Sequence, residues 1–210
     1  MMGSQPARVP IFPLAGALLF PRAQLPLHIF EDRYREMVRD AIDGAGQIAM
    51  IQPLHDGDNA PLHKVGCLGD LVGVEELDDG RFNIILQGVQ RFRWIREAES
   101  NALYRVADVD LAAFDDSEPD PLSPAMRAAV EEEARAFGDA LRLQVDWEQV
   151  ARLDDETFVN AIAQVAPFDV GAKQALLEEE SLARRAELVT QLMQFQRLAP
   201  GGAASDQTLQ

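Results

Sequence analysis

The spacing of apolar and polar positions divides the chain into a β-rich first half and a helical second half. Residues 104–111 alternate strictly between apolar and polar side chains, which predicts a half-buried strand. Looser alternation over residues 66–77 and 81–95 predicts two further strands, and the Asp-Gly pair between them predicts a hairpin. A short apolar run at residues 47–52 predicts one more strand, and Gly88 marks a bulge or bend in the long second hairpin strand.

Helical spacing appears once before these strands and dominates after residue 121. In the first predicted helix, residues 31–43, one face carries Tyr34, Met37, Val38, Ala41 and Ile42. The later pattern predicts helices over residues 124–143, 155–165, 170–177 and 181–198. Ser181 begins the last of these as its N-cap, where a hydroxyl can accept a backbone hydrogen bond.

The opening of the chain is apolar but is interrupted repeatedly by proline. Pro13, Pro21 and Pro26 break the stretch that precedes the first helix. Because proline lacks a backbone donor and fixes φ, neither a long helix nor a central strand can continue through these positions. We therefore expect short strand pieces that lead into a helix beginning near Glu31.

The order of these elements predicts an α+β fold in two parts. We expect a β-rich subdomain over residues 8–115 and a helical subdomain over residues 121–198. The acidic, proline-containing segment between them predicts a linker. The small, polar residues 199–210 predict a disordered tail.

Composition and charge narrow the class of protein. The chain has 210 residues, of which 47% are hydrophobic and 26% charged, with a formal net charge of −16. Such an acidic surface repels phosphate backbones and anionic membranes, so we expect neither nucleic acid nor a membrane as partner. The single cysteine, Cys67, suggests a reducing compartment, and no apolar run reaches the length of a membrane span. We therefore expect a cytoplasmic protein.

The chain contains none of the common catalytic motifs. It lacks a phosphate-binding P-loop, a nucleophile elbow, a zinc-binding H-E-x-x-H helix and a dinucleotide-binding glycine turn. We accordingly predict no enzyme activity, no cofactor, no catalytic residue and no metal ligand. One alternative is a metal-dependent hydrolase that uses the loop at residues 55–63, where His55, Asp56, Asp58 and His63 lie close together, although their spacing fits a turn-rich surface loop better.

A second alternative is RNA binding. Arg91, Arg93 and Arg96 alternate with Phe92 and Trp94, and arginine with aromatic side chains can clamp single strands. The same alternation also fits a strand whose aromatic side chains face the core while its arginines face solvent or pair with nearby carboxylates. The net charge favours this structural interpretation.

Three blocks of sequence resemble one known family. The opening pattern P-L-x-x-x-L-x-F-P-x-x-x-L-P-L-x-I-F-E-x-R-Y resembles the start of the substrate-binding N-terminal domain of Lon protease. Gly88-Val89-Gln90-Arg91-Phe92 resembles the family's G-x-x-R-F block, and Lys173-Gln174-Ala175-Leu176-Leu177-Glu178 resembles a block near its end. The likeness covers about residues 8–198. It implies a PUA-like twisted β-barrel with one helix, followed by a helical bundle.

The resemblance also implies a function. The chain is similar to a non-catalytic module that recognises unfolded proteins, exposed apolar segments or a partner protein. Because the ATPase and peptidase domains of Lon proteases are absent from this sequence, we expect a free-standing member. We expect an apolar groove near Phe20, Leu25, Ile29 and Tyr34 to make the contacts, although each of these side chains alone is more often a core residue.

Overall fold

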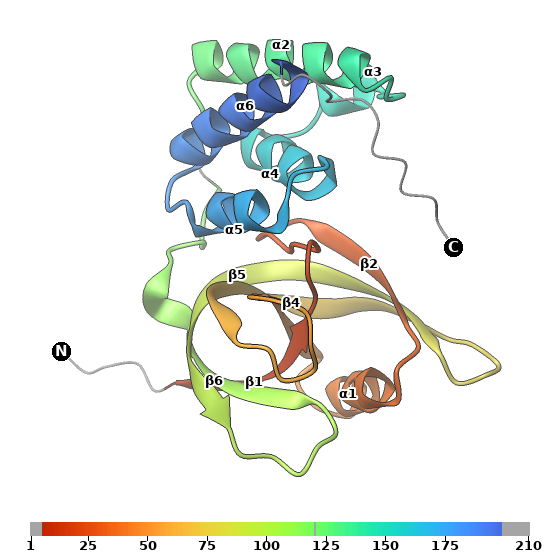
Figure 1. Cartoon of the computed structure of the whole chain (residues 1–210). Helices are drawn as coiled ribbons and strands as arrows, with labels where there is room; N and C mark the ends of the chain where they lie inside the picture. The colour runs from red at the N-terminus through yellow and green to blue at the C-terminus, as the bar shows by residue number, and fades with distance from the viewer. Residues whose placement is uncertain (1–5, 120, 199–210) are drawn as a thin grey trace. The chain divides into compact units, whose positions relative to one another are not determined.

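The computed structural model describes residues 6–119 and 121–198, which belong to two compact units (Figure 1). The first unit contains the chain up to Pro119 together with residues 169–178, and the second contains residues 120–168 and the chain from Glu179 onward. Helix α5 (Val170–Glu178) therefore lies in the same unit as the strands, whereas the sequence pattern groups it with the other late helices. The predicted disordered tail, residues 199–210, lies outside the described residues.

Six strands form one mixed sheet in the first unit. Their order is β2-β5-β4-β3-β1-β6, and β6 also pairs with β5, so five of the strands form a closed circuit with β2 outside it. The pair β1–β3 is parallel and the other pairs are antiparallel. The strands are β1 (Ala7–Pro13), β2 (Gln24–Ile29), β3 (Gln47–Pro53), β4 (Leu62–Glu76), β5 (Phe82–Ala98) and β6 (Arg105–Asp110).

The hairpin of β4 and β5 is the longest feature of the sheet and extends beyond the other strands in Figure 1. Its turn is the predicted one: Gly80 has a φ of 76°, a backbone conformation that glycine adopts without a steric penalty. The register shifts at Val72 and at Val89. The second shift directly follows Gly88, so the predicted bulge is confirmed.

Helix α1 (Asp32–Asp43) covers an apolar core of this unit. Tyr34, Met37, Val38 and Ala41 are buried there, as their spacing predicts. Ile42, which the sequence places on the same face, is 50% exposed. It lies at the edge of the apolar stripe, in the last turn of the helix, where the core no longer covers it.

Helix α5 is fastened to the strands of its unit by buried polar contacts. The amide of Gln174 donates to the Val65 carbonyl at 3.1 Å and accepts from the amide of Gln52 at 3.0 Å. Lys173 donates to the Gly16 carbonyl at 3.0 Å, and burial lowers the pKa of its ammonium group. Leu176 and Leu177 are fully buried. Buried amides without partners would destabilise the unit, so these bonds explain why α5 stays with the strands.

The second unit is helical. It contains α2 (Pro124–Ala140), α3 (Trp147–Val150), α4 (Asp155–Val165) and α6 (Leu182–Leu198), and α2 packs along α6. The hydroxyl of Ser181 accepts from the backbone of Arg184 at 3.3 Å, which confirms the predicted N-cap. Helix α2 ends before the predicted position because Arg142 has a positive φ of 57°. The short α3 was not predicted, since a single turn has too little periodicity to detect.

The elements establish an α+β fold, as the sequence predicts. Within the described ranges, the helices fall short of the length and apolar character that crossing a membrane requires.

Strand β6 carries a buried carboxylate that should make stability depend on pH. Asp108 accepts from Arg8 at 3.2 Å and from Arg96 at 2.9 Å. Burial alone would raise the pKa of this carboxyl, but the two hydrogen bonds outweigh burial and lower the pKa. A lowered pKa stabilises the fold above the unfolded-state value of about 3.9, and this contribution is lost as the pH falls through the lower folded-state value.

We therefore expect Asp108→Asn to reduce the loss of stability in acid. The free energy of unfolding of the unchanged protein should fall more steeply below about pH 4 than that of the variant, because only the unchanged protein must protonate this carboxylate. Urea unfolding at several pH values measures the difference. Asp43→Asn, at an exposed position, is the matched control. Identical pH profiles for the unchanged protein and Asp108→Asn would contradict the assignment.

Candidate functional site

A cavity of about 360 Å³ opens where three strands end and α1 begins. The carboxyl ends of β1 and β3 lie together because these strands are parallel, and Leu14 donates to the Ile51 carbonyl at 3.0 Å just beyond β1. The last residues of β2 and the first turn of α1 form another side of the cavity. The loop after β3, with Asp56 and Asp58, completes it.

The floor of the cavity is apolar. The rings of Phe12 and Tyr34 are tilted against each other with centroids 4.3 Å apart, and both side chains are almost fully buried. Burial raises the pKa of the Tyr34 phenol, although Arg33 opposes this, so the ring is uncharged at neutral pH. Leu14 and Leu27 are half-buried beside the floor. These side chains offer apolar surface that a bound group could cover.

Phe30 lies at the rim and is 61% exposed. Its ring stacks loosely on His28, with centroids 6.3 Å apart. An aromatic side chain that is mostly in water loses the free energy that its burial would provide, about 1.5–3 kcal/mol for a phenylalanine. Beside the cavity floor, this exposed ring adds apolar area that a bound group could cover.

Charged groups surround this apolar surface. The guanidinium of Arg33 lies over the Tyr34 ring, 4.6 Å from its centroid, and pairs with Glu31 at 2.7 Å and with Asp58 at 2.9 Å. Arg33 thereby holds the loop after β3 against the start of α1.

The structure brings two of the four predicted contact residues to this cavity. Ile29, 1% exposed, and Tyr34, 8% exposed, line it with a small part of their surface. Phe20 is fully buried in the core and Leu25 is half-buried on β2, and neither lines the cavity. A contact role for these four side chains stays a prediction.

Sequence reasoning missed Phe12, Leu14, Leu27 and Phe30 as cavity residues. All four lie in the proline-broken opening that the pattern singles out as the most unusual stretch. The position of Phe30 at the junction of an apolar strand and an acidic helix start was the available signal. The sequence pattern could not predict the exposure of Phe30, because alternation assigns a face to a residue but does not show what covers that face.

The loop that suggested a metal site has ordinary loop geometry. The ring Nδ1 of His55 lies 3.0 Å from the Asp56 carbonyl oxygen, and Asp58 pairs with Arg33. Across residues 6–119 and 121–198, no group of three or more histidine, cysteine, aspartate or glutamate side chains could hold a metal ion. The loop instead contributes carboxylates to the rim of the cavity.

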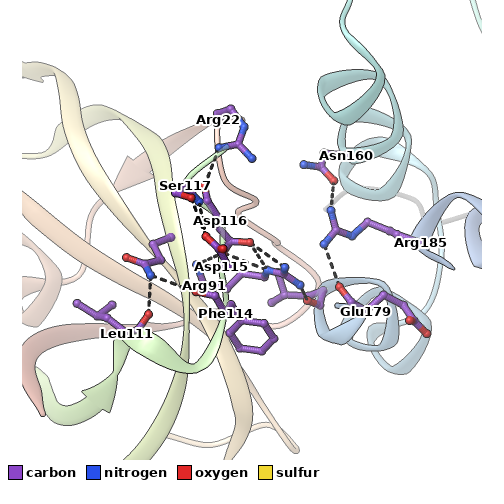
Figure 2. A network of polar contacts seen from close by, with 12 residues as sticks. Arg22, Arg91, Leu111, Phe114, Asp115, Asp116, Ser117, Asn160, Glu179 and Arg185 are labelled. Atoms are coloured by element: carbon purple, nitrogen blue, oxygen red, sulfur yellow. Dashed lines mark hydrogen bonds and ion pairs between the residues drawn. The ribbon is translucent and has the colours of Figure 1, made fainter. Parts of the chain in front are cut away.

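The arginines that suggested RNA binding are engaged within the protein. Arg91 is buried, and its Nη2 lies 2.8 Å from Oδ1 of Asp116 (Figure 2). The Nη1 of Arg91 donates to the Leu177 carbonyl at 3.1 Å, and its guanidinium lies over the Phe114 ring. Arg96 pairs with Asp108 at 2.7 Å. Arg91 and Arg96 thus pair with carboxylates, but with more distant partners than the neighbouring glutamates. Arg93 is exposed and lies 5.7 Å from the centroid of the Phe114 ring. The expected alternation fails at Arg91, which is buried next to the buried Phe92.

Comparison with known proteins gives the family. Residues 8–194 match the family described as "ATP-dependent protease La (LON) substrate-binding domain". The chain belongs to this family. Its match therefore concerns the substrate-binding domain of Lon proteases, as the three sequence blocks indicated.

The relatives of this Lon-type domain are longer proteins. It is 24% identical over 198 residues to the Lon protease of Cytophaga hutchinsonii, a match that covers 90% of this chain and 24% of the relative. It is 30% identical over 93 residues to the Lon protease of Desulfosudis oleivorans, covering 42% of this chain and 11% of the relative. The chain thus spans about a quarter or less of the curated relatives that it matches.

Solved structures share the fold. A Lon N-terminal domain protein from Xanthomonas campestris has a TM-score of 0.65 at 23% identity, covering 90% of this chain and 98% of that one. The N-terminal domain of a Mycobacterium avium complex Lon protease has a TM-score of 0.66 at 16% identity, with the same coverage of both chains. The first and second units together thus correspond to the extent of a Lon N-terminal domain.

The Lon-type sequence blocks have structural explanations in this chain. Gly88 lies so close to the backbone of Phe20 that a Cβ atom would be 1.9 Å from its carbonyl oxygen. Arg91 forms the buried ion pair with Asp116, and Phe92 is fully buried. The block that begins at Lys173 fastens α5 to the strands. These motifs thus have roles in maintaining the fold.

Proposed function

We propose that this protein is a non-catalytic recognition module that binds exposed apolar peptide segments in the cavity at the start of α1. The observation that carries this proposal is a cavity with an apolar floor and with Phe30, 61% exposed, at its rim. When large apolar side chains of an unfolded segment cover Phe30, Leu14 and Leu27, the burial of apolar surface stabilises the complex. Membership of the Lon substrate-binding family supports a protein as the partner.

The geometry also favours recognition over chemistry. The charge of Arg33 is partly neutralised by Glu31 and Asp58. Burial keeps the Tyr34 phenol uncharged, although Arg33 lies over its ring. A general base or nucleophile needs a pKa shifted toward neutrality and a partner that activates it. The cavity instead offers apolar area and fixed charge, which suit reversible binding of a side chain.

Phe30→Ser should weaken the binding of an apolar peptide by about tenfold or more, since the variant loses aromatic area that the peptide would cover. Fluorescence anisotropy with a short fluorescein-labelled peptide, in which phenylalanine and leucine are set in a glycine–serine framework, measures the affinity. Phe195→Ser is the matched control, because Phe195 is 74% exposed on α6 and lies outside the cavity.

The control should bind as the unchanged protein does. Equal affinities of Phe30→Ser and the unchanged protein would place binding elsewhere. Failure of the unchanged protein to bind the peptide at micromolar concentrations would overturn the proposed function itself.

The family resemblance extends this proposal to the fold type and the location. We propose that the closed circuit of five strands corresponds to a PUA-like barrel, and the helices of the second unit to the helical bundle. The single buried cysteine supports a reducing compartment such as the cytoplasm.

A further inference from the structure

The charges that line the cavity do not cancel. Three carboxylates lie on it, those of Glu31, Asp56 and Asp58, against the single guanidinium of Arg33. With His28 taken as neutral, the lining carries two net negative charges. This excess is local, since it comes from side chains around one opening and not from the overall charge of the protein.

The guanidinium is not available to an acidic ligand. It already binds both Glu31, at 2.7 Å, and Asp58, at 2.9 Å, and its remaining face lies over Tyr34. The carboxylate of Asp58 is 80% exposed in spite of this contact, and Asp56 is also exposed. Among the described residues, Asp56 forms no ion pair. A ligand therefore meets carboxylates at the rim before it reaches the apolar floor.

The apolar floor and the acidic rim together specify a chemistry. A large apolar side chain of a bound peptide can lie against Leu14, Leu27 and Phe30. The residues that flank it in the peptide then lie near the carboxylates. Cations placed there gain a favourable interaction, and anions are repelled. Lysine and arginine also suit the site because their aliphatic stems can lie on the exposed Phe30 ring.

We propose that the cavity selects peptide segments in which a large apolar residue is flanked by lysine or arginine. This selectivity rests on the proposed function, since it describes which peptides the same cavity prefers. It is separate from the general attraction of an acidic protein for basic ligands, because it depends on the carboxylates of this one opening.

Three labelled peptides test the selectivity. All carry the same central phenylalanine and leucine, flanked by serine, by lysine or by glutamate. In fluorescence anisotropy, the lysine-flanked peptide should bind about fivefold tighter than the serine-flanked one, and the glutamate-flanked peptide about fivefold weaker, as expected for partly exposed charge pairs. The differences should shrink in about 0.5 M salt, because salt screens exposed charges.

A pair of variants separates local from overall charge. Asp56→Lys reverses a charge on the cavity rim, and Asp78→Lys makes the same change in the exposed hairpin turn, at a residue that does not line the cavity. Both variants have the same net charge. Asp56→Lys should abolish the preference for lysine flanks, whereas Asp78→Lys should retain it. If both variants lose the preference equally, overall charge explains it and the proposed selectivity is wrong.

The outcomes also distinguish the proposed selectivity from the proposed peptide-binding function on which it rests. If all three peptides bind equally, the cavity recognises apolar residues without regard to their flanks, and only the selectivity is overturned. If none binds, the proposed function fails as well. If sedimentation shows a dimer that none of the three peptides dissociates, a second copy of the chain occupies the cavity, which likewise overturns the preference for basic segments.

Discussion

Replacing Asp116 by asparagine should destabilise the first unit by about 3–5 kcal/mol, the cost of breaking a buried ion pair by removing one partner. Both side chains of the Arg91–Asp116 pair are 4% exposed, so water cannot replace the lost carboxylate. Asp116 also accepts from the backbone nitrogen of Arg91 at 2.7 Å. An asparagine amide would place a donor against the guanidinium donors and would remove the carboxylate charge that opposes the buried guanidinium.

Tryptophan fluorescence can follow this unit alone. The chain has two tryptophans, Trp94 on β5 in the first unit and Trp147 on α3 in the second. In a Trp147→Phe background, urea unfolding reports on Trp94, and the midpoint should fall by about 1–3 M for Asp116→Asn. Following one unit avoids assigning a single free energy to a chain with two.

The neighbouring aspartate provides the control. Asp115 is exposed and accepts hydrogen bonds only locally, from Ser117, so Asp115→Asn changes the same functional group outside the buried pair. Its midpoint should stay close to that of the Trp147→Phe background. Equal midpoints for Asp115→Asn and Asp116→Asn would show that the buried pair does not stabilise the unit.

Gly88→Ala should cost about 3 kcal/mol or more, because the new methyl group would meet backbone that cannot move away. A Cβ atom at this position would lie 1.9 Å from the carbonyl oxygen of Phe20 and 2.7 Å from its carbonyl carbon. The backbone of Gly88 is held on both sides, since it donates to Ala23 and accepts from Arg22, each at 2.8 Å. Relief of the clash would break these bonds.

Gly73→Ala is the matched control in the same hairpin. A Cβ atom there would lie 3.3 Å from side-chain atoms of Ile85, which is 39% exposed and can rotate. We expect a change below about 1 kcal/mol. Urea unfolding in the Trp147→Phe background measures both variants. If Gly88→Ala destabilises the unit no more than Gly73→Ala does, the prediction is wrong. The backbone between β1 and β2 would then be able to move away from the new methyl group.

Local patterns predicted the elements of this fold well, and for physical reasons. Alternation and the Asp-Gly turn located β4, β5 and β6, because a sheet with one buried face imposes a period of two. The predicted helix over residues 155–165 matches α4, and α1 begins one residue later than expected. In each case, the residues that determine the structure are neighbours in sequence.

The packing of residues that are distant in sequence could not be predicted from these local sequence patterns. The segment containing Asp116 has the composition of a solvated linker, and its carboxylate is buried only because Arg91 meets it from β5. Likewise, Phe20 and Phe30 are both apolar residues of the opening, but one is in the core and the other is mostly in water. Which of them contacts a ligand depends on what covers each, and that is a property of the folded chain.

The division of the chain between units has a consequence for its synthesis. The first unit contains the strands up to Pro119 but also α5, whose last residue is Glu178. A ribosome must therefore add about 60 residues after the sheet has emerged before the missing helix is available, which at about 5–20 residues per second takes roughly 3–12 s. During that interval, the surfaces that Gln174, Leu176 and Leu177 later cover are open on the nascent chain. The domain for which we propose recognition of exposed apolar segments thus passes through a stage in which it exposes such a surface itself.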